Sequence, residues 1–175
     1  MKTWTAEPQL WAALDHSVPD ILASQKDNGQ FGTEPWISID QNVLLTLAAA
    51  WSLEKSAYYQ SENVLRAIER GGYAIQDAQD EVGMVIFRKK DHSTWGQIYM
   101  PWVYSRWIRA FALVKDAMSD EAKTRWTEGL ILGYDGIART ALDRVHNIPT
   151  IDQLSACRDV PAARADKAVT GTGGR

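Results

Sequence analysis

Hydrophobic residues recur every three or four positions along most of the chain, which is the spacing of one face of an α-helix. Polar turn residues and glycine separate these stretches, as in QKDNGQFG after the first of them. The pattern predicts five helices, at about Glu7–Gln25, Asp40–Glu54, Ser61–Ile75, Pro101–Met118 and Ser119–Ala141. Strand signals are weak, and GMVIF at 83–87 is the one candidate. The chain is therefore predicted to be all-α.

Individual residues refine these helices. Pro19 is expected to kink or divide the first helix, because proline has no N–H for the helical ladder. Asp40, Ser61 and Ser119 are expected to cap the second, third and fifth helices, since short polar side chains accept the free N–H groups of a first turn. The second helix is apolar nearly all round between Val43 and Trp51, which is typical of a helix buried inside a bundle.

A short internal repeat supports an arrangement of helical hairpins. The segment ILASQKDNGQF aligns without a gap with IQDAQDEVGMV, at a spacing of 54 residues. The alignment pairs Gln25 with Gln79 and Gly29 with Gly83. Each copy is followed by a loop that contains tryptophan and then by a strongly apolar helix. A period near 50 residues that holds two helices fits an array of α-hairpins.

If the hairpins surround an axis, the apolar second and fourth helices lie inside and the others outside. The loops that enter the inner helices, residues 29–41 and 83–101, then lie at one end of the array, together with residues 141–150. Their side chains that can stack, bind or transfer protons are Trp36, Asp40, Gln41, Arg88, Lys89, Lys90, Asp91, His92, Trp95, Tyr99, His146 and Asn147. This end is the predicted site.

Composition narrows the classes of function. A net charge of −3 and a pI near 5.6 give no electrostatic footprint for nucleic acid or an anionic membrane. No apolar run reaches membrane-spanning length and no secretory signal is visible, so a cytoplasmic protein is expected. The single cysteine and three histidines offer no zinc set, and phosphate-binding and dinucleotide motifs are absent. No cofactor is therefore expected.

Charged, titratable and aromatic side chains in these loops are candidates for binding or catalysis. The run Arg88-Lys89-Lys90 is suited to attract an anionic substrate, although such runs also occur in solvated loops. His92 and His146 are candidate general acids or bases, because histidine titrates near neutrality. Trp36 and Trp95 occupy equivalent loops and suit either a stacking platform or packing against the rim of the bundle.

The repeated element QKDNGQF, with DHSTWGQIYMPW and RVHNIPT, resembles the α/α-toroid proteins. Among these it is most similar to the helical domain of polysaccharide lyases of the heparinase and alginate-lyase kind, and to six-hairpin glycosidases. The resemblance implies β-elimination on a uronate-containing oligo- or polysaccharide. It implies His146 or Tyr99 as base or acid, Asn147 as the group that neutralises the uronate carboxylate, and Trp36 and Trp95 as stacking walls.

Other functions stay open. A glycoside hydrolase of the same toroid class needs two carboxylates across its cleft, for which Asp40 and Asp91 are the candidates. A non-catalytic module that binds a partner chain, or self-associates, through exposed inner-helix faces is a third alternative. A terpene-cyclase-like toroid ranks last, since the chain has no aspartate-rich motif.

The residues after Thr150 differ in composition from those before it. IDQLSACRDVPAARADKAVTGTGGR has few large apolar residues and no helical stripe, so it cannot bury enough surface to offset its chain entropy. We expect a partial toroid domain over 1–150 and a disordered or aberrant tail over 151–175, as in a truncated or frame-shifted product.

Overall fold

The computed structural model describes residues 7–32, 40–88, 91, 93–99 and 101–141. This part of the chain is mostly helical, which confirms the all-α prediction. The helices are α1 (Glu7–Ala23), α3 (Val43–Ser52), α4 (Glu62–Ala78), α5 (Pro101–Val114) and α6 (Asp120–Ala141), and the strands are β1 (Val85–Arg88) and β2 (Thr94–Ile98). The expected boundary at residue 150 lies outside the described residues.

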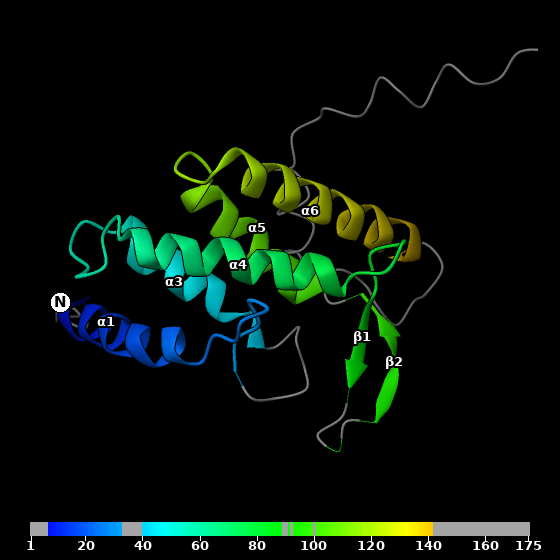
Figure 1. Cartoon of the computed structure of the whole chain (residues 1–175), viewed down its shortest axis with the longest axis horizontal. Helices are drawn as coiled ribbons and strands as arrows, with labels where there is room; N and C mark the ends of the chain where they lie inside the picture. Colours follow the sequence, from blue (N-terminus) through cyan, green and yellow to red (C-terminus); the bar gives the residue numbers. More distant parts are fainter. Residues whose placement is uncertain (1–6, 33–39, 89–90, 92, 100, 142–175) are drawn as a thin grey trace, which may run out of the picture.

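The helices are arranged around a central pair. α3 and α5 pack against each other, α1 packs on α3, α4 contacts α3 and α6, and α6 also contacts α5. In Figure 1, α1, α4 and α6 run in the same direction, and the chain returns through α3 and α5. We call α1, α4 and α6 the flanking helices. The described parts of the connections that enter α3 and α5 consequently lie at one end, which we call the loop end.

The core lies between the central pair and the flanking helices. Leu44 and Leu47 of α3 are fully buried, as expected for a helix that is apolar on all sides. Trp107 of α5 lies edge-on to Trp126 of α6, with ring centroids 5.6 Å apart, and both side chains are buried. Leu113 of α5 is 43 % exposed, so α5 offers some apolar surface at its outer side.

The predicted helix boundaries and caps are met in part. α1 continues through Pro19 and is not divided. Ser119 caps α6, because its Oγ accepts the N–H of Ala122 at 3.2 Å. Ser61 occupies the N-cap position of α4 without a capping hydrogen bond from its side chain. The cap predicted at Asp40 is wrong, since α3 begins at Val43 and its N-cap position is Asn42.

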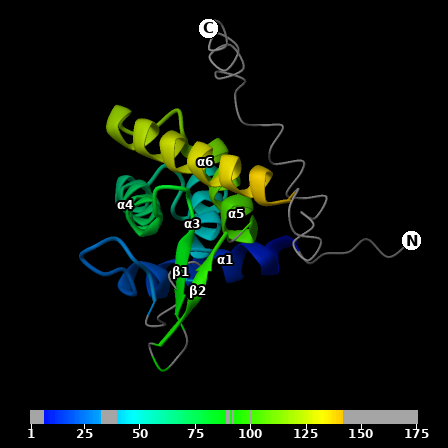
Figure 2. The same ribbon diagram turned by 90° about the vertical axis from the view of Figure 1, so that its right-hand side faces the viewer.

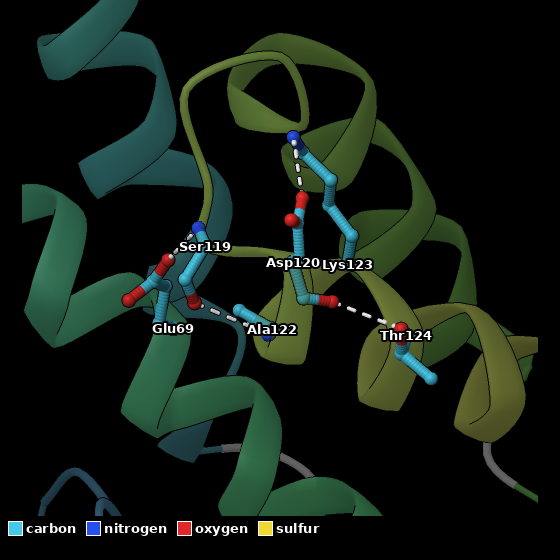
Figure 3. A network of polar contacts seen from close by, with 6 residues as sticks. All are labelled: Glu69, Ser119, Asp120, Ala122, Lys123 and Thr124. Carbon is cyan, nitrogen blue, oxygen red and sulfur yellow. Dashed lines mark hydrogen bonds and ion pairs between the residues drawn. The ribbon is translucent and has the colours of Figure 1, made fainter.

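The start of α6 is also tied to α4 (Figure 3). The N–H of Ser119 donates to Oε1 of Glu69, in α4, at 2.8 Å. Within α6 itself, the hydroxyl of Thr124 donates to the carbonyl of Asp120 at 2.9 Å, and Nζ of Lys123 lies 3.6 Å from the Asp120 carboxylate. One serine therefore joins the cap of α6 to the neighbouring flanking helix.

The strands form a two-stranded antiparallel hairpin that extends away from the helices (Figures 1 and 2). The candidate strand at 83–87 is confirmed for residues 85–87, where Val85 is buried and Ile86 is 41 % exposed, as alternation requires. β2 was not predicted, because Gly96 interrupts its short pattern and only pairing with β1 defines it.

Candidate functional site

The loop end is built on two copies of one turn, at residues 26–30 and 80–84. In each copy the first residue donates its N–H to the carbonyl of the fifth, at 2.8 Å in both. The glycine at the fourth position donates to the carbonyl of the first, at 2.9 Å for Gly29 and 3.0 Å for Gly83. Both glycines have positive φ, +84° and +85°, which L side chains rarely adopt. The two repeat copies thus share one backbone structure.

A glutamine at the start of each turn reaches the next flanking helix. Nε2 of Gln25 donates to the carbonyl of Ala67 in α4 at 2.8 Å. Nε2 of Gln79 donates to the carbonyl of Gly129 in α6, also at 2.8 Å. Gln25 and Gln79, which the sequence repeat pairs, therefore make equivalent contacts with successive flanking helices.

The glycine of each turn packs on the same helix, against the carbonyl three residues after the one that accepts the glutamine. A Cβ on Gly29 would lie 2.2 Å from the carbonyl oxygen of Arg70, and one on Gly83 would lie 2.8 Å from that of Leu132. In the first copy the guanidinium of Arg70 also donates to the turn carbonyls of Lys26 (3.1 Å) and Asp27 (2.8 Å). The turns leave no room for a side chain at the glycine position.

Gln41, a predicted substrate-binding residue, is engaged inside the protein. It is 1 % exposed. Its Oε1 accepts the N–H of Phe31 at 3.0 Å, and its Nε2 donates to the carbonyl of Gly71 at 2.9 Å and, at 3.5 Å, to that of Gly29. The carboxamide therefore joins the start of α3 to the first turn and to α4, and it does not face a ligand.

Tyr104 ties the second turn to α5, as Gln41 ties the first turn to α3. Its hydroxyl donates to the carbonyl of Gly83 at 2.7 Å and accepts a hydrogen bond from Nε2 of Gln79 at 2.9 Å. Burial raises the pKa of Tyr104 to about 12, against the smaller lowering effect of the Gln79 hydrogen bond. Sequence reasoning missed Tyr104, which lies in the first turn of α5, whereas Gln41 lies just before α3.

Tyr99, a predicted acid or base, lies at the base of the hairpin. It is half-buried, and its hydroxyl donates to the carbonyl of Val82 at 3.1 Å. Its ring lies close to Gly136 of α6. The donated hydrogen bond therefore holds the phenol in place. The hydroxyl oxygen still has lone pairs that can accept a hydrogen bond from a ligand.

Asp80 fixes the second turn and the hairpin together. Its Oδ1 accepts the N–H groups of Val82 at 3.0 Å and Met84 at 2.8 Å, and its Oδ2 accepts Nε2 of Gln97, in β2, at 3.2 Å. An aspartate that bonds the backbone two residues ahead is a recognised turn signal. Sequence reasoning missed it because the first copy has Lys26 in the same place.

Of the other predicted site residues, the structure describes only some. Arg88 ends β1 opposite Thr94, and Trp95 belongs to β2, which places both on the hairpin. Asp91, between the strands, is exposed and accepts the N–H and hydroxyl of Ser93 at 3.0 and 2.6 Å. Trp36, Lys89, Lys90, His92, His146 and Asn147 lie outside the described residues.

The described residues show neither a cluster of metal ligands nor a membrane-spanning helix. Within the described ranges, no group of three or more His, Cys, Asp or Glu side chains is placed to hold a metal ion. None of the described helices is long and apolar enough to cross a membrane. No protein-family model matches the chain, and neither a curated protein nor a solved structure is significantly similar to it.

Proposed function

We propose that this chain forms part of an α/α toroid and that its loop end binds a uronate-containing glycan and cleaves it by β-elimination. The observation that carries the proposal is the pair of equivalent turns, each tied to the next flanking helix by Gln25 or Gln79. A unit that repeats this contact extends naturally into a ring of hairpins. The central pair α3 and α5, with α4 and α6 side by side outside it, agrees with such an array.

An anionic substrate is favoured by the charge of the hairpin. Arg88, Lys89 and Lys90 are consecutive cations in a chain whose net charge is −3. Asp80 and Tyr99 anchor the base of the hairpin to the second turn. Arg88 ends β1, so its charge lies on this anchored hairpin. A uronate chain carries one carboxylate per residue and matches such a segment.

β-Elimination requires a base that removes the proton next to the uronate carboxyl group, a partner that neutralises this carboxylate, and an acid that protonates the leaving oxygen. By resemblance to the toroid lyases, His146 or Tyr99 supplies the base or acid and Asn147 the neutralising group. His92 is a further candidate acid or base, since histidine titrates near neutrality. Tyr99 has a fixed phenol oxygen at the loop end, which suits this role.

The test is an assay of the full chain against alginate, polygalacturonate and other uronate polysaccharides, in which unsaturated products are followed by their near-ultraviolet absorbance. We expect product with at least one polymer and a large loss of turnover in Tyr99→Phe and His146→Ala. Tyr59→Phe is the matched control, because Tyr59 is 40 % exposed in the loop between α3 and α4, at the opposite end. New reducing ends without absorbance would point to the hydrolase alternative, and no cleavage at all would reject an enzyme of either kind.

A further inference from the structure

The three flanking helices carry one pattern of residues. It is visible when Ile21, Ile75 and Ile137 are aligned, at spacings of 54 (75 − 21) and 62 (137 − 75) residues. The five aligned positions are Leu10, Ala13, Leu14, Ser17 and Ile21 in α1, Val64, Ala67, Ile68, Gly71 and Ile75 in α4, and Trp126, Gly129, Leu130, Gly133 and Ile137 in α6. Large apolar residues occupy the first, third and fifth positions, and small residues occupy the second and fourth.

In α4 and α6 this face receives the turn of the preceding unit. The carbonyl at the second position, Ala67 or Gly129, accepts the turn glutamine. A small side chain there lets the carboxamide approach the helix backbone, and a Cβ on Gly129 would already lie 2.9 Å from Oε1 of Gln79. The same apolar pattern is therefore linked, in two helices, to the same neighbour.

In α1 the face has the same pattern of large and small residues, but no turn among the described residues packs on it. Leu10 is 66 % exposed, whereas its counterparts Val64 and Trp126 are 0 % exposed. Ala13 is exposed, whereas its counterpart Ala67 is 6 % exposed. The difference is largest at the N-terminal end of α1, since Leu14, Ser17 and Ile21 further along the same face are partly buried.

We propose that the face of α1 formed by Leu10 and Ala13 docks a helical hairpin whose outer helix ends in a Gln-x-x-x-Gly turn. The partner glutamine donates to the carbonyl of Ala13, as Gln25 donates to that of Ala67. The partner glycine lies on the carbonyl of His16, the counterpart of Arg70. This inference rests on the repeated contacts alone and is independent of the proposed catalytic function.

The partner surface is not the α6 end of a second copy of this chain. At the spacing that relates α4 to α6, Ala141 stands where Gln79 would recur and Val145 where Gly83 would recur. Neither residue supplies a carboxamide donor or tolerates positive φ as glycine does. The occupant is thus a further unit of the repeat that retains both residues.

A tandem chain tests the proposal, made by inserting a second copy of residues 7–60 before Glu7 of the full protein. Docking predicts one cooperative urea transition with a larger m-value than that of the natural chain, because more surface is exposed on unfolding. It also predicts slower amide hydrogen exchange in the original α1. Two separate transitions, with unchanged exchange in α1, would overturn the proposal.

Leu10→Glu in the original α1 gives the discriminating comparison. In the natural chain the side chain is mostly exposed, so the urea midpoint should hardly move. In the tandem chain the same substitution buries a charge, and the midpoint should fall by about 1 M or the transition should split. Gln25→Ala in the added copy is the second variant and should reverse part of the gain. Equal effects of Leu10→Glu in the two chains would refute docking at this face.

Sedimentation of the natural chain distinguishes a Gln-x-x-x-Gly unit from a second copy of this chain as the partner at this face. A monomer is expected across the concentrations used for unfolding. If the chain instead dimerises and Leu10→Glu abolishes the dimer, the face binds a second copy, and the assignment to a Gln-x-x-x-Gly unit is wrong. Neither result depends on cleavage of a glycan, so this proposal and the catalytic one can fail separately.

Discussion

Nε2 of Gln79 donates to the backbone carbonyl of Gly129, 2.8 Å away and 50 residues further along the chain. The same carboxamide also donates to the hydroxyl of Tyr104 at 2.9 Å. One side chain thus joins the end of α4 to both α5 and α6. Contacts of this range are formed only in the folded protein, so their loss is felt directly in its free energy of unfolding.

Gln79→Ala is therefore expected to lower the free energy of unfolding by about 1–2 kcal/mol, the usual range for loss of partly buried hydrogen bonds. Urea denaturation followed by tryptophan fluorescence measures the change. Gln97→Ala is the matched control: Gln97 is exposed and its one described bond, to Asp80, is 3.2 Å long, so the cost should stay below about 0.5 kcal/mol. Equal costs would mean that the contact with α6 contributes nothing specific.

The second turn predicts a sharp difference between two glycines. Gly83 has φ +85°, and a Cβ there would meet the carbonyl oxygen of Leu132 at 2.8 Å, whereas Gly96 has nothing within 4 Å. Gly83→Ala should cost about 2–3 kcal/mol from the left-handed backbone and the close contact together. Gly96→Ala should change stability by less than about 0.5 kcal/mol. Thermal and urea unfolding of the two variants, measured side by side, decide the matter.

The sequence predicts most of the helices because the local helical pattern of apolar residues agrees with the way these residues pack. Helical periodicity locates the helices to within a few residues, and the alignment of Gln25 with Gln79 identifies positions that later prove equivalent in space. The hairpin is predicted less well. Its second strand contains Gly96 and depends on pairing with β1, which local propensity cannot report.

The candidate site is less predictable than the fold. A polar residue in a loop next to an inner helix looks the same in sequence whether it faces solvent or the core. The loop position of Gln41 predicts a ligand-binding residue, but the structure buries its carboxamide against backbone groups. Tyr104 was overlooked for the converse reason, since an aromatic residue on an apolar helix face is typical of a core.

The two predicted serine caps give a further test. Ser119 accepts the N–H of Ala122, while Ser61 stands at the N-cap position without a capping bond. Ser119→Ala should destabilise the protein by about 1 kcal/mol, the usual cost of a lost N-cap. Ser61→Ala should cost clearly less, as judged from urea midpoints. A larger effect at Ser61 would show that the side-chain bond of Ser119 is not what stabilises the start of α6.

The proposed glycan site predicts that Arg88 and Lys90 contribute to the binding of an anionic polymer. The double variant Arg88→Gln/Lys90→Gln should weaken binding to polygalacturonate roughly tenfold at low salt, with the difference shrinking as added salt screens exposed charges. Titration calorimetry at two salt concentrations measures both effects. Lys55→Gln/Lys115→Gln removes the same charge from exposed positions beyond the carboxyl ends of α3 and α5, and it should leave binding nearly unchanged. Equal losses in the two double variants would show that net charge alone attracts the polymer.

The buried hydroxyl of Tyr104 predicts a pH dependence of stability. Burial raises its pKa from 10.0 to about 12, so the folded protein holds this proton more tightly than the unfolded chain does. The contribution is fully present below about pH 10. It is lost as pH rises from about 10 to about 12, by about 3 kcal/mol in all, because ionisation then favours the unfolded chain.

Urea unfolding between pH 8 and pH 12 checks this, with Tyr104→Phe as the comparison, since both proteins share every other titrating group. The variant loses the hydrogen bond to the Gly83 carbonyl, so it should be less stable at pH 8. Its stability should also fall less steeply above about pH 10, and the curves for the two proteins should converge. Parallel curves would show that the Tyr104 proton is lost equally easily in the folded and unfolded chains, and that burial of this hydroxyl does not govern its ionisation.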